Sequence, residues 1–161
     1  MHADYKRILI SIMSKILAAD IGGTKTLVQL SEYNAGHYQL LCEKNYNSMD
    51  YDSFDAVLTA FRAEAMYTTI DQACFAVAGP VSHTGSSANV TNLPWSLERD
   101  HLCSAFAINR VKLINDFHAV AIGIDTLNAD ELLTLQQGQP RQAENQQSPD
   151  RRHGACIPRT Y

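Results

Sequence analysis

Short apolar runs separated by turn residues fill the first part of the chain. The segments 15–20, 26–33 and 37–46 are rich in apolar residues. A Gly-Gly pair (22–23) separates the first two segments, and an Asn-Ala-Gly sequence (34–36) separates the second from the third. Because Gly and Asn favour the backbone angles of tight turns, the pattern predicts a meander of three antiparallel strands.

The next segment changes to helical spacing. Between residues 53 and 66 the apolar side chains recur at the i, i+3, i+4, i+7 spacing of a single helix face. These apolar positions are Phe54, Val57, Leu58, Phe61 and Ala65. Ser53 carries a hydroxyl that can cap the first turn. We therefore expect a helix over 53–66.

A second strand and a second helix are predicted further along the chain. The buried-type strand 72–79 ends at a Gly-Pro pair, and a loop rich in Ser, Gly and His leads to 88–95. A helix from Ser96 to about Phe106 follows, because Ser96 can cap it and Glu98 falls in its first turn.

The last predicted pair is a strand over 110–115 and a mostly apolar helix over 116–127, with no loop between them. Strands that alternate with helices are typical of an α/β fold, in which the later strands run parallel to the first. The sequence therefore predicts a mixed five-stranded sheet, an antiparallel meander plus parallel strands, flanked by helices.

Composition narrows the class of protein. The chain has 161 residues, of which 45% are hydrophobic and 19% charged, as in a globular domain with one core. A net charge of −4 argues against general affinity for nucleic acid. No apolar run approaches the roughly 18 residues of a membrane-spanning helix. We expect neither nucleic acid nor membrane as a partner.

The four cysteines stand far apart, without a Cys-x-x-Cys motif or a Cys-His cluster. Cys42, Cys74 and Cys103 lie in apolar surroundings, which is typical of reduced cysteines in a core. We therefore expect no zinc site and a cytoplasmic location.

The two ends of the chain differ from the middle. Met13 begins the sequence "MSKILAAD", which leads directly into the first strand, so we expect residues 1–13 to be an N-terminal extension. Residues 136–161 are mostly polar and lack periodicity, which predicts a disordered tail. The predicted globular domain is 14–135.

The turn "ADIGGT" (19–24) combines groups that suit a phosphate. Glycines allow a ligand to approach the backbone closely, and successive N–H groups in a turn can bind phosphate oxygens. Thr24 adds a hydroxyl, and Asp20 adds a carboxylate suited to Mg²⁺, directly or through water. A plain hairpin turn with polar neighbours would also explain this sequence.

A second polar pair, Asn115-Asp116, falls where a strand ends and a helix begins. Open α/β sheets bind ligands at the carboxyl edge of their strands. Asp116 could accept a proton from a substrate hydroxyl, and Asn115 could bind a neighbouring hydroxyl. The alternative is that Asp116 only caps the helix.

Two loops could line the same edge. The loop 78–81 contains Gly79, whose backbone can lie close to a ligand, and the loop 91–95 contains Asn92 and Trp95. In the simpler interpretation Trp95 anchors the core and Asn92 is a turn residue.

In this order, "ADIGGT", "AVAGPV", "TNLPW" and "LINDF" resemble the N-terminal domain of the bacterial glucokinases, within the actin-like, ribonuclease-H-fold sugar kinases. "DIGGTK" alone is shared with many acyl and sugar kinases, whereas its combination with "TNLPW" and "INDF" is more specific. The resemblance covers about residues 15–140. It implies the ribonuclease-H-like N-terminal domain of the actin-type ATPases.

The resemblance also implies roles for residues. The phosphates of ATP would contact Ala19, Asp20, Ile21, Gly22, Gly23 and Thr24. Asp20 would lie near Mg²⁺. Asp116 would be the base that activates the 6-hydroxyl of glucose or a similar hexose. The sugar would be bound by Asn115, Asn92 and Gly79.

The family's second phosphate loop and its further Glu and His sugar ligands do not follow residue 140. We therefore expect a truncated or frameshifted glucokinase chain that is inactive alone and self-associates through its uncovered face. The alternatives are a non-enzymatic sugar-responsive or partner-binding remnant, or another hexose kinase.

Overall fold

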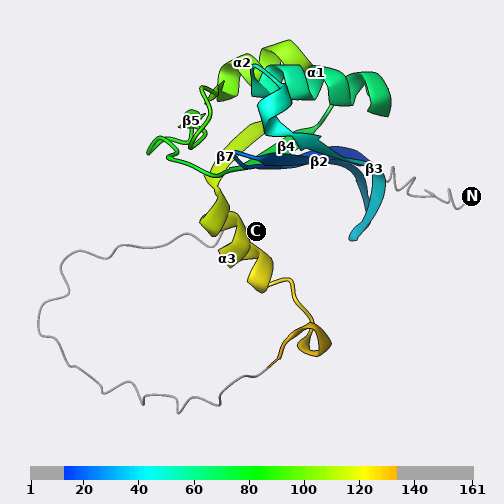
Figure 1. Ribbon diagram of the computed structural model, residues 1–161. Coiled ribbons are helices and arrows are strands. Elements are labelled where there is room, and N and C mark those ends of the chain that lie inside the picture. Colours follow the sequence, from blue (N-terminus) through cyan, green and yellow to red (C-terminus); the bar gives the residue numbers. More distant parts are fainter. Residues whose placement is uncertain (1–12, 134–161) are drawn as a thin grey trace, which may run out of the picture. The chain divides into compact units, whose positions relative to one another are not determined.

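The computed structural model describes residues 13–133. Its main sheet has five strands in the order β3-β2-β1-β4-β7. These are β1 (Ser14–Ile21), β2 (Lys25–Asn34), β3 (His37–Asn47), β4 (Gln72–Val77) and β7 (Val111–Asn115). The first three form the predicted antiparallel meander, and β4 and β7 run parallel to β1. The predicted α/β class and mixed sheet are confirmed (Figure 1).

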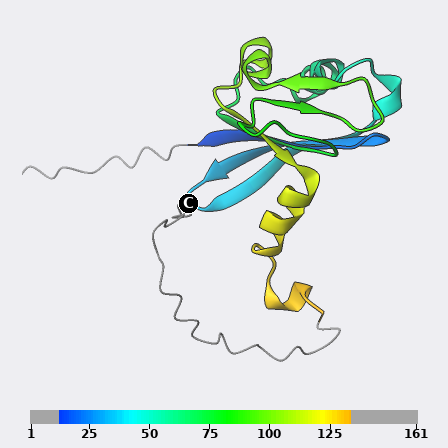
Figure 2. The same ribbon diagram turned by 90° about the vertical axis from the view of Figure 1, so that its left-hand side faces the viewer.

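Two helices, α1 (Phe54–Ala65) and α2 (Arg99–Phe106), cover one face of this sheet, as both ribbon views show (Figures 1 and 2). The Ser53 hydroxyl accepts a hydrogen bond from the Ala56 amide and starts α1 as predicted. The core lies between the helices and the sheet, where the rings of Phe54 and Phe75 meet edge to face with centroids 5.0 Å apart. Full burial of each such side chain contributes about 1.5–3 kcal/mol.

Strand alternation places one set of residues in this core and the other set on the opposite face of the sheet. In β1, Leu17, Ala19 and Ile21 are buried against the helices. Asp20 lies between two of these positions and therefore projects from the opposite face. Helix α3 (Asp116–Ile124) leaves the sheet on this second side (Figures 1 and 2).

The prediction that Ser96 caps a helix is wrong. Ser96–Glu98 forms strand β6, which pairs with β5 (Ser87–Asn89) in a small antiparallel sheet, and α2 begins only at Arg99. Leu97 is buried and its two neighbours are exposed, which is the alternation of a strand. This segment therefore forms a strand, although Ser96 has the chemistry of a helix cap. The apolar helix predicted over 116–127 ends earlier, at Ile124.

The turn between β2 and β3 forms as predicted, with left-handed backbone at Ala35 and at Gly36 (φ +93°). The chain divides into two compact units after Leu127. In the described part of the second unit, the 3-10 turn η2 (Ala129–Glu131) follows Asn128, which forms a capping box with Glu131. The expected N-terminal extension and disordered tail lie outside the described residues, except for Met13.

Candidate functional site

The carboxyl ends of the three parallel strands meet at one edge of the sheet. Ile21 at the end of β1 pairs in register with Val77 at the end of β4, and Val77 pairs with Asn115 at the end of β7. The residues that follow each strand are therefore neighbours in space. This edge is where open α/β sheets bind their ligands.

Hydrogen bonds join the four sequence segments that we singled out. The Ala78 amide donates to the Ile21 carbonyl (2.9 Å), and the Thr91 amide donates to the Ala78 carbonyl (2.8 Å). The Asn115 side-chain amide donates to the Gly79 carbonyl (3.1 Å). The loop after β4 thus contacts the other three segments.

Two glycines are required here by close packing. A Cβ on Gly79 would lie 2.0 Å from the carbonyl oxygen of Asn89, and a Cβ on Gly23 would lie 2.9 Å from that of Thr91. Both distances are shorter than carbon and oxygen atoms tolerate. The turn after β1 and the loop after β4 therefore pack directly against the backbone of residues 89–91.

The turn after β1 is closed by a hydrogen bond from the Gly22 amide to the Lys25 carbonyl (3.0 Å). Within the described part of the chain, the amides of Gly23 and Thr24 have no recorded acceptor, so they can donate to a ligand. The side chains of Ala19 and Ile21, by contrast, are buried in the core and cannot reach a ligand. Only the backbone of these two residues could approach a nucleotide.

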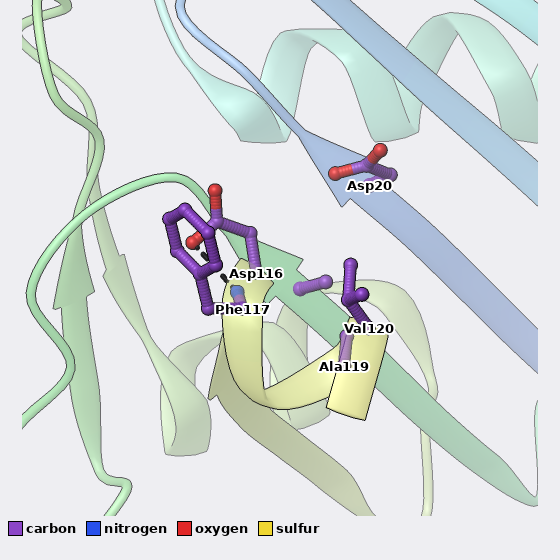
Figure 3. Close-up of a pocket in the computed structure, with 6 residues that line it drawn as sticks. Asp20, Asp116, Phe117, Ala119 and Val120 are labelled. Carbon is purple, nitrogen blue, oxygen red and sulfur yellow. Dashed lines mark hydrogen bonds between the residues drawn. The ribbon is translucent and has the colours of Figure 1, made fainter. Parts of the chain in front are cut away.

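Asp20 and Asp116 line one cleft of about 510 Å³ on the face of the sheet opposite α1. Asp20 enters it from β1, and Asp116 enters it from the first residue of α3 (Figure 3). The remaining lining residues are apolar: Ala76, Phe117, Ala119 and Val120. The cleft therefore brings together the predicted metal ligand and the predicted base.

The start of α3 distinguishes the roles of Asn115 and Asp116. Asn115 is the N-cap, and its side-chain oxygen accepts from the Phe117 amide (3.1 Å). Asp116 accepts from the same amide through Oδ1 (2.9 Å), and its Oδ2 has no recorded partner among residues 13–133. The interpretation of Asp116 as a simple N-cap is therefore wrong, because the residue before it occupies that position.

The loop 91–95 confirms the simpler interpretation of its Trp. Trp95 is 2% exposed, and its indole N–H donates to the Tyr51 carbonyl (3.2 Å). Asn92 is an exposed turn residue with left-handed backbone (φ 65°) beside Gly23. Its contact with a sugar stays a prediction.

Among residues 13–133, no group of three or more His, Cys, Asp or Glu side chains is arranged to hold a metal ion. Asp20 nevertheless suits Mg²⁺, which proteins often bind through one or two carboxylates together with substrate phosphates and water. No helix in residues 13–133 is long and apolar enough to span a membrane.

Sequence reasoning missed two groups of residues in this region. Phe117 and Val120 form apolar walls of the cleft, and their place depends on the direction in which α3 leaves the sheet. Thr26 and Ser48 are buried hydroxyl residues behind the turn. The only signal for Thr26 was its position in the buried row of β2.

Solved structures of other proteins share this fold. A glucokinase from an Antarctic psychrotroph is 27% identical, with a TM-score of 0.67 over 78% of this chain and 39% of that one. A glucokinase from Balamuthia mandrillaris in complex with glucose is 25% identical, with a TM-score of 0.53 over 74% of this chain and 34% of that one. The fold is that of the actin-like sugar kinases.

The family follows from sequence similarity. The model of the glucokinase family matches residues 17–148, and a glucokinase of Nostoc sp. is 41% identical over 128 residues. The chain belongs to the glucokinase family. It spans 37% of the length of the Nostoc relative, and the match covers 78% of this chain.

Proposed function

We propose that this chain carries the phosphate-binding turn and the catalytic base of an ATP-dependent kinase that phosphorylates glucose at the 6-hydroxyl, the entry step of glycolysis. The observation that supports this most directly is that Asp20 and Asp116 line one cleft at the carboxyl edge of the sheet. The amides of Gly23 and Thr24, which have no acceptor among residues 13–133, lie on the turn that follows Asp20.

Each residue has a part in the transfer. Asp116 accepts the proton of the 6-hydroxyl through Oδ2 while the hydroxyl oxygen attacks the γ-phosphorus and the bond to ADP breaks. In the turn that begins at Gly22, the amides of Gly23 and Thr24 donate hydrogen bonds to the phosphate oxygens. Asp20 would hold Mg²⁺, directly or through water, and a bound ion would supply positive charge to the phosphates. Backbone atoms of Ala19 and Ile21 complete this wall.

The sugar would bind on the other side of the cleft. Asn115 keeps one N–H and one lone pair beyond the bonds it makes to Gly79 and Phe117, so it can still bind a hexose hydroxyl. The exposed Asn92 side chain and the Gly79 backbone are further candidates. The relative from Balamuthia that was solved with glucose supports a hexose as the substrate.

We expect the chain by itself to show negligible turnover, because phosphoryl transfer requires both substrates to be enclosed and aligned. A coupled assay with ATP, Mg²⁺ and glucose tests this. Robust turnover that disappears in Asp116→Asn would show that the chain is active alone.

Binding tests the kinase assignment even without turnover. We expect titration of the ¹⁵N-labelled chain with Mg-ATP to shift the amide signals of Gly23 and Thr24. Asp20→Asn should abolish the dependence of this shift on Mg²⁺. The matched control is Glu98→Gln, which removes an exposed carboxylate that does not line the cleft. Shifts confined to other regions, or none, would contradict a nucleotide site.

The cysteines support a cytoplasmic location. Within residues 13–133, Cys42, Cys74 and Cys103 form no disulfide and are half-buried, which is typical of proteins in a reducing compartment. We propose the cytoplasm as the site of the reaction. Fractionation of the source cells, with the chain recovered in a membrane or extracellular fraction, would contradict this.

Helix α3 also supports self-association of the chain. None of its residues is buried, although it is mostly apolar, and the side chain of Phe117 is 80% exposed. Large exposed apolar surfaces favour association. Sedimentation should therefore show dimers of the wild-type chain at micromolar concentration. Ile122→Glu or Ile124→Glu should make the chain monomeric. The control Met66→Glu changes an exposed residue at the end of α1 and should leave the dimer intact. A monomeric wild-type chain would contradict this.

A further inference from the structure

Two hydroxyl side chains lie fully buried directly behind the proposed phosphate turn. Thr26, near the start of β2, and Ser48, the first residue of the 3-10 turn η1 (Ser48–Asp50), are the only buried polar residues in the described part of the chain. Both are 0% exposed. A buried hydroxyl is destabilising unless it is hydrogen-bonded, so its partners indicate its purpose.

The side chains of this pair and the Ser48 amide hold the turn. The Ser48 hydroxyl donates to the Gly22 carbonyl (2.8 Å), and the Ser48 amide donates to the Thr24 carbonyl (2.9 Å). The hydroxyl oxygens of Thr26 and Ser48 are 2.9 Å apart. Because Ser48 uses its own proton for Gly22, Thr26 is the donor in this contact.

These bonds determine where the turn directs its amides. A trans peptide unit is planar, so its N–H points away from its C=O. The Gly22 carbonyl and the Gly23 amide belong to the same peptide unit. When Ser48 holds the Gly22 carbonyl toward the core, the Gly23 N–H points out of the core, where no acceptor is recorded within the described residues.

We propose that Ser48 is a positioning residue for nucleotide binding, and that Thr26 supports it by fixing the direction of its hydroxyl. This inference rests on the proposed function, because it assigns a ligand to the Gly23 amide. Ser48 touches neither substrate nor metal. Its effect is to keep the turn in one conformation before the phosphate arrives, so that binding loses less conformational entropy.

The first test does not require a ligand. In the wild-type chain the ¹⁵N order parameters of Gly23 and Thr24 should be about 0.85, the value of a rigid backbone. In Ser48→Ala they should fall below about 0.6, the value of a flexible backbone. Thr26→Val, which keeps the shape but removes the hydroxyl, should lower them partly. Thr26→Ser keeps the hydroxyl and should restore them. Unchanged order parameters in Ser48→Ala would overturn the inference.

The second test uses Mg²⁺-tripolyphosphate, which presents phosphates without adenosine. Ser48→Ala should weaken its binding by about tenfold, the effect expected from one lost hydrogen bond, and Thr26→Ser should bind like the wild type. The matched control is Ser53→Ala, which loses the cap of α1 and therefore some stability, but should keep the wild-type affinity.

The outcomes separate the two claims. If the wild-type chain binds tripolyphosphate and Ser48→Ala binds equally well, Ser48 has no positioning role, whereas the proposed nucleotide site stands. If Ser53→Ala weakens binding as much as Ser48→Ala does, the effect is one of general stability and the inference fails. If the wild-type turn is rigid but its amides do not respond to tripolyphosphate or Mg-ATP, the nucleotide site itself is refuted, together with the role of Ser48 in it.

Discussion

Gly79 allows a quantitative test of how the edge of the sheet is built. A Cβ at this position would lie 2.0 Å from the Asn89 carbonyl oxygen, whereas ordinary contacts begin at 3.4 Å. In Gly79→Ala the backbone around Asn89 must therefore retreat by about 1.4 Å. This backbone is held by bonds from the Thr91 amide to Ala78 (2.8 Å) and from the Asn89 amide to Pro80 (3.1 Å).

The expected cost follows from these contacts. Loss of two backbone hydrogen bonds costs about 1–3 kcal/mol, and the strain that remains after relaxation adds a similar amount. We expect Gly79→Ala to lower the free energy of unfolding by about 3 kcal/mol, which corresponds to about 10 °C in Tm for a domain of this size. Urea unfolding followed by Trp95 fluorescence and by circular dichroism measures this loss.

Gly123→Ala is the matched control. Gly123 lies inside α3 with no atom within 4 Å of its would-be Cβ, so alanine should stabilise the helix by roughly 0.5–1 kcal/mol. If Gly79→Ala and Gly123→Ala changed stability by the same amount, the close approach of the two backbones would not be what requires glycine at position 79.

Three further predictions concern single side chains. Burial, assisted by the Glu64 carboxylate, raises the pKa of Tyr46 to about 12. The contribution of the Tyr46 hydroxyl to stability is therefore complete below pH 10 and is lost as the pH rises from 10 through 12. Urea unfolding at pH 7 and 11 should show that Tyr46→Phe loses less stability between these two pH values than the wild type. Trp95→Phe should lower the free energy of unfolding by about 1–2 kcal/mol, because the Tyr51 carbonyl loses its donor. Thermal unfolding measures this loss, and an unchanged Tm would contradict it. Burial raises the pKa of the Cys74 thiol, although Lys112 opposes the shift. Mass spectrometry should therefore find that iodoacetamide at pH 7.5 alkylates Cys74 more slowly in the native chain than in urea. Equal rates would refute this prediction.

Much of the fold could be predicted because hydrophobic periodicity and burial agree. The apolar side of α1, from Phe54 to Phe61, is the side that packs on the sheet. The start of α2 could not be predicted in this way. Ser96 has the chemistry of a cap, but its pairing with Asn89 and the burial of Leu97 are tertiary effects that local sequence does not report.

The candidate site was predictable only where polar residues end a strand. Asp20 and Asp116 met this condition, and the register of β1, β4 and β7 then brought their segments to one edge. Ser48 did not meet it. Its contact with Gly22 spans 26 positions in the chain, and a serine after a strand has no distinctive pattern.

The register of the three parallel strands has a consequence for the width of the cleft. One strand, β4, separates the strands that lead to Asp20 and Asp116. Neighbouring strands lie about 4.8 Å apart, so the two supports are about 10 Å apart. The backbone hydrogen bonds between these strands fix this distance, because Asp20 lies within β1 and Asp116 directly follows β7. The cleft therefore cannot close by bringing the two carboxyl groups together, and its width follows from the strand pairing of the sheet.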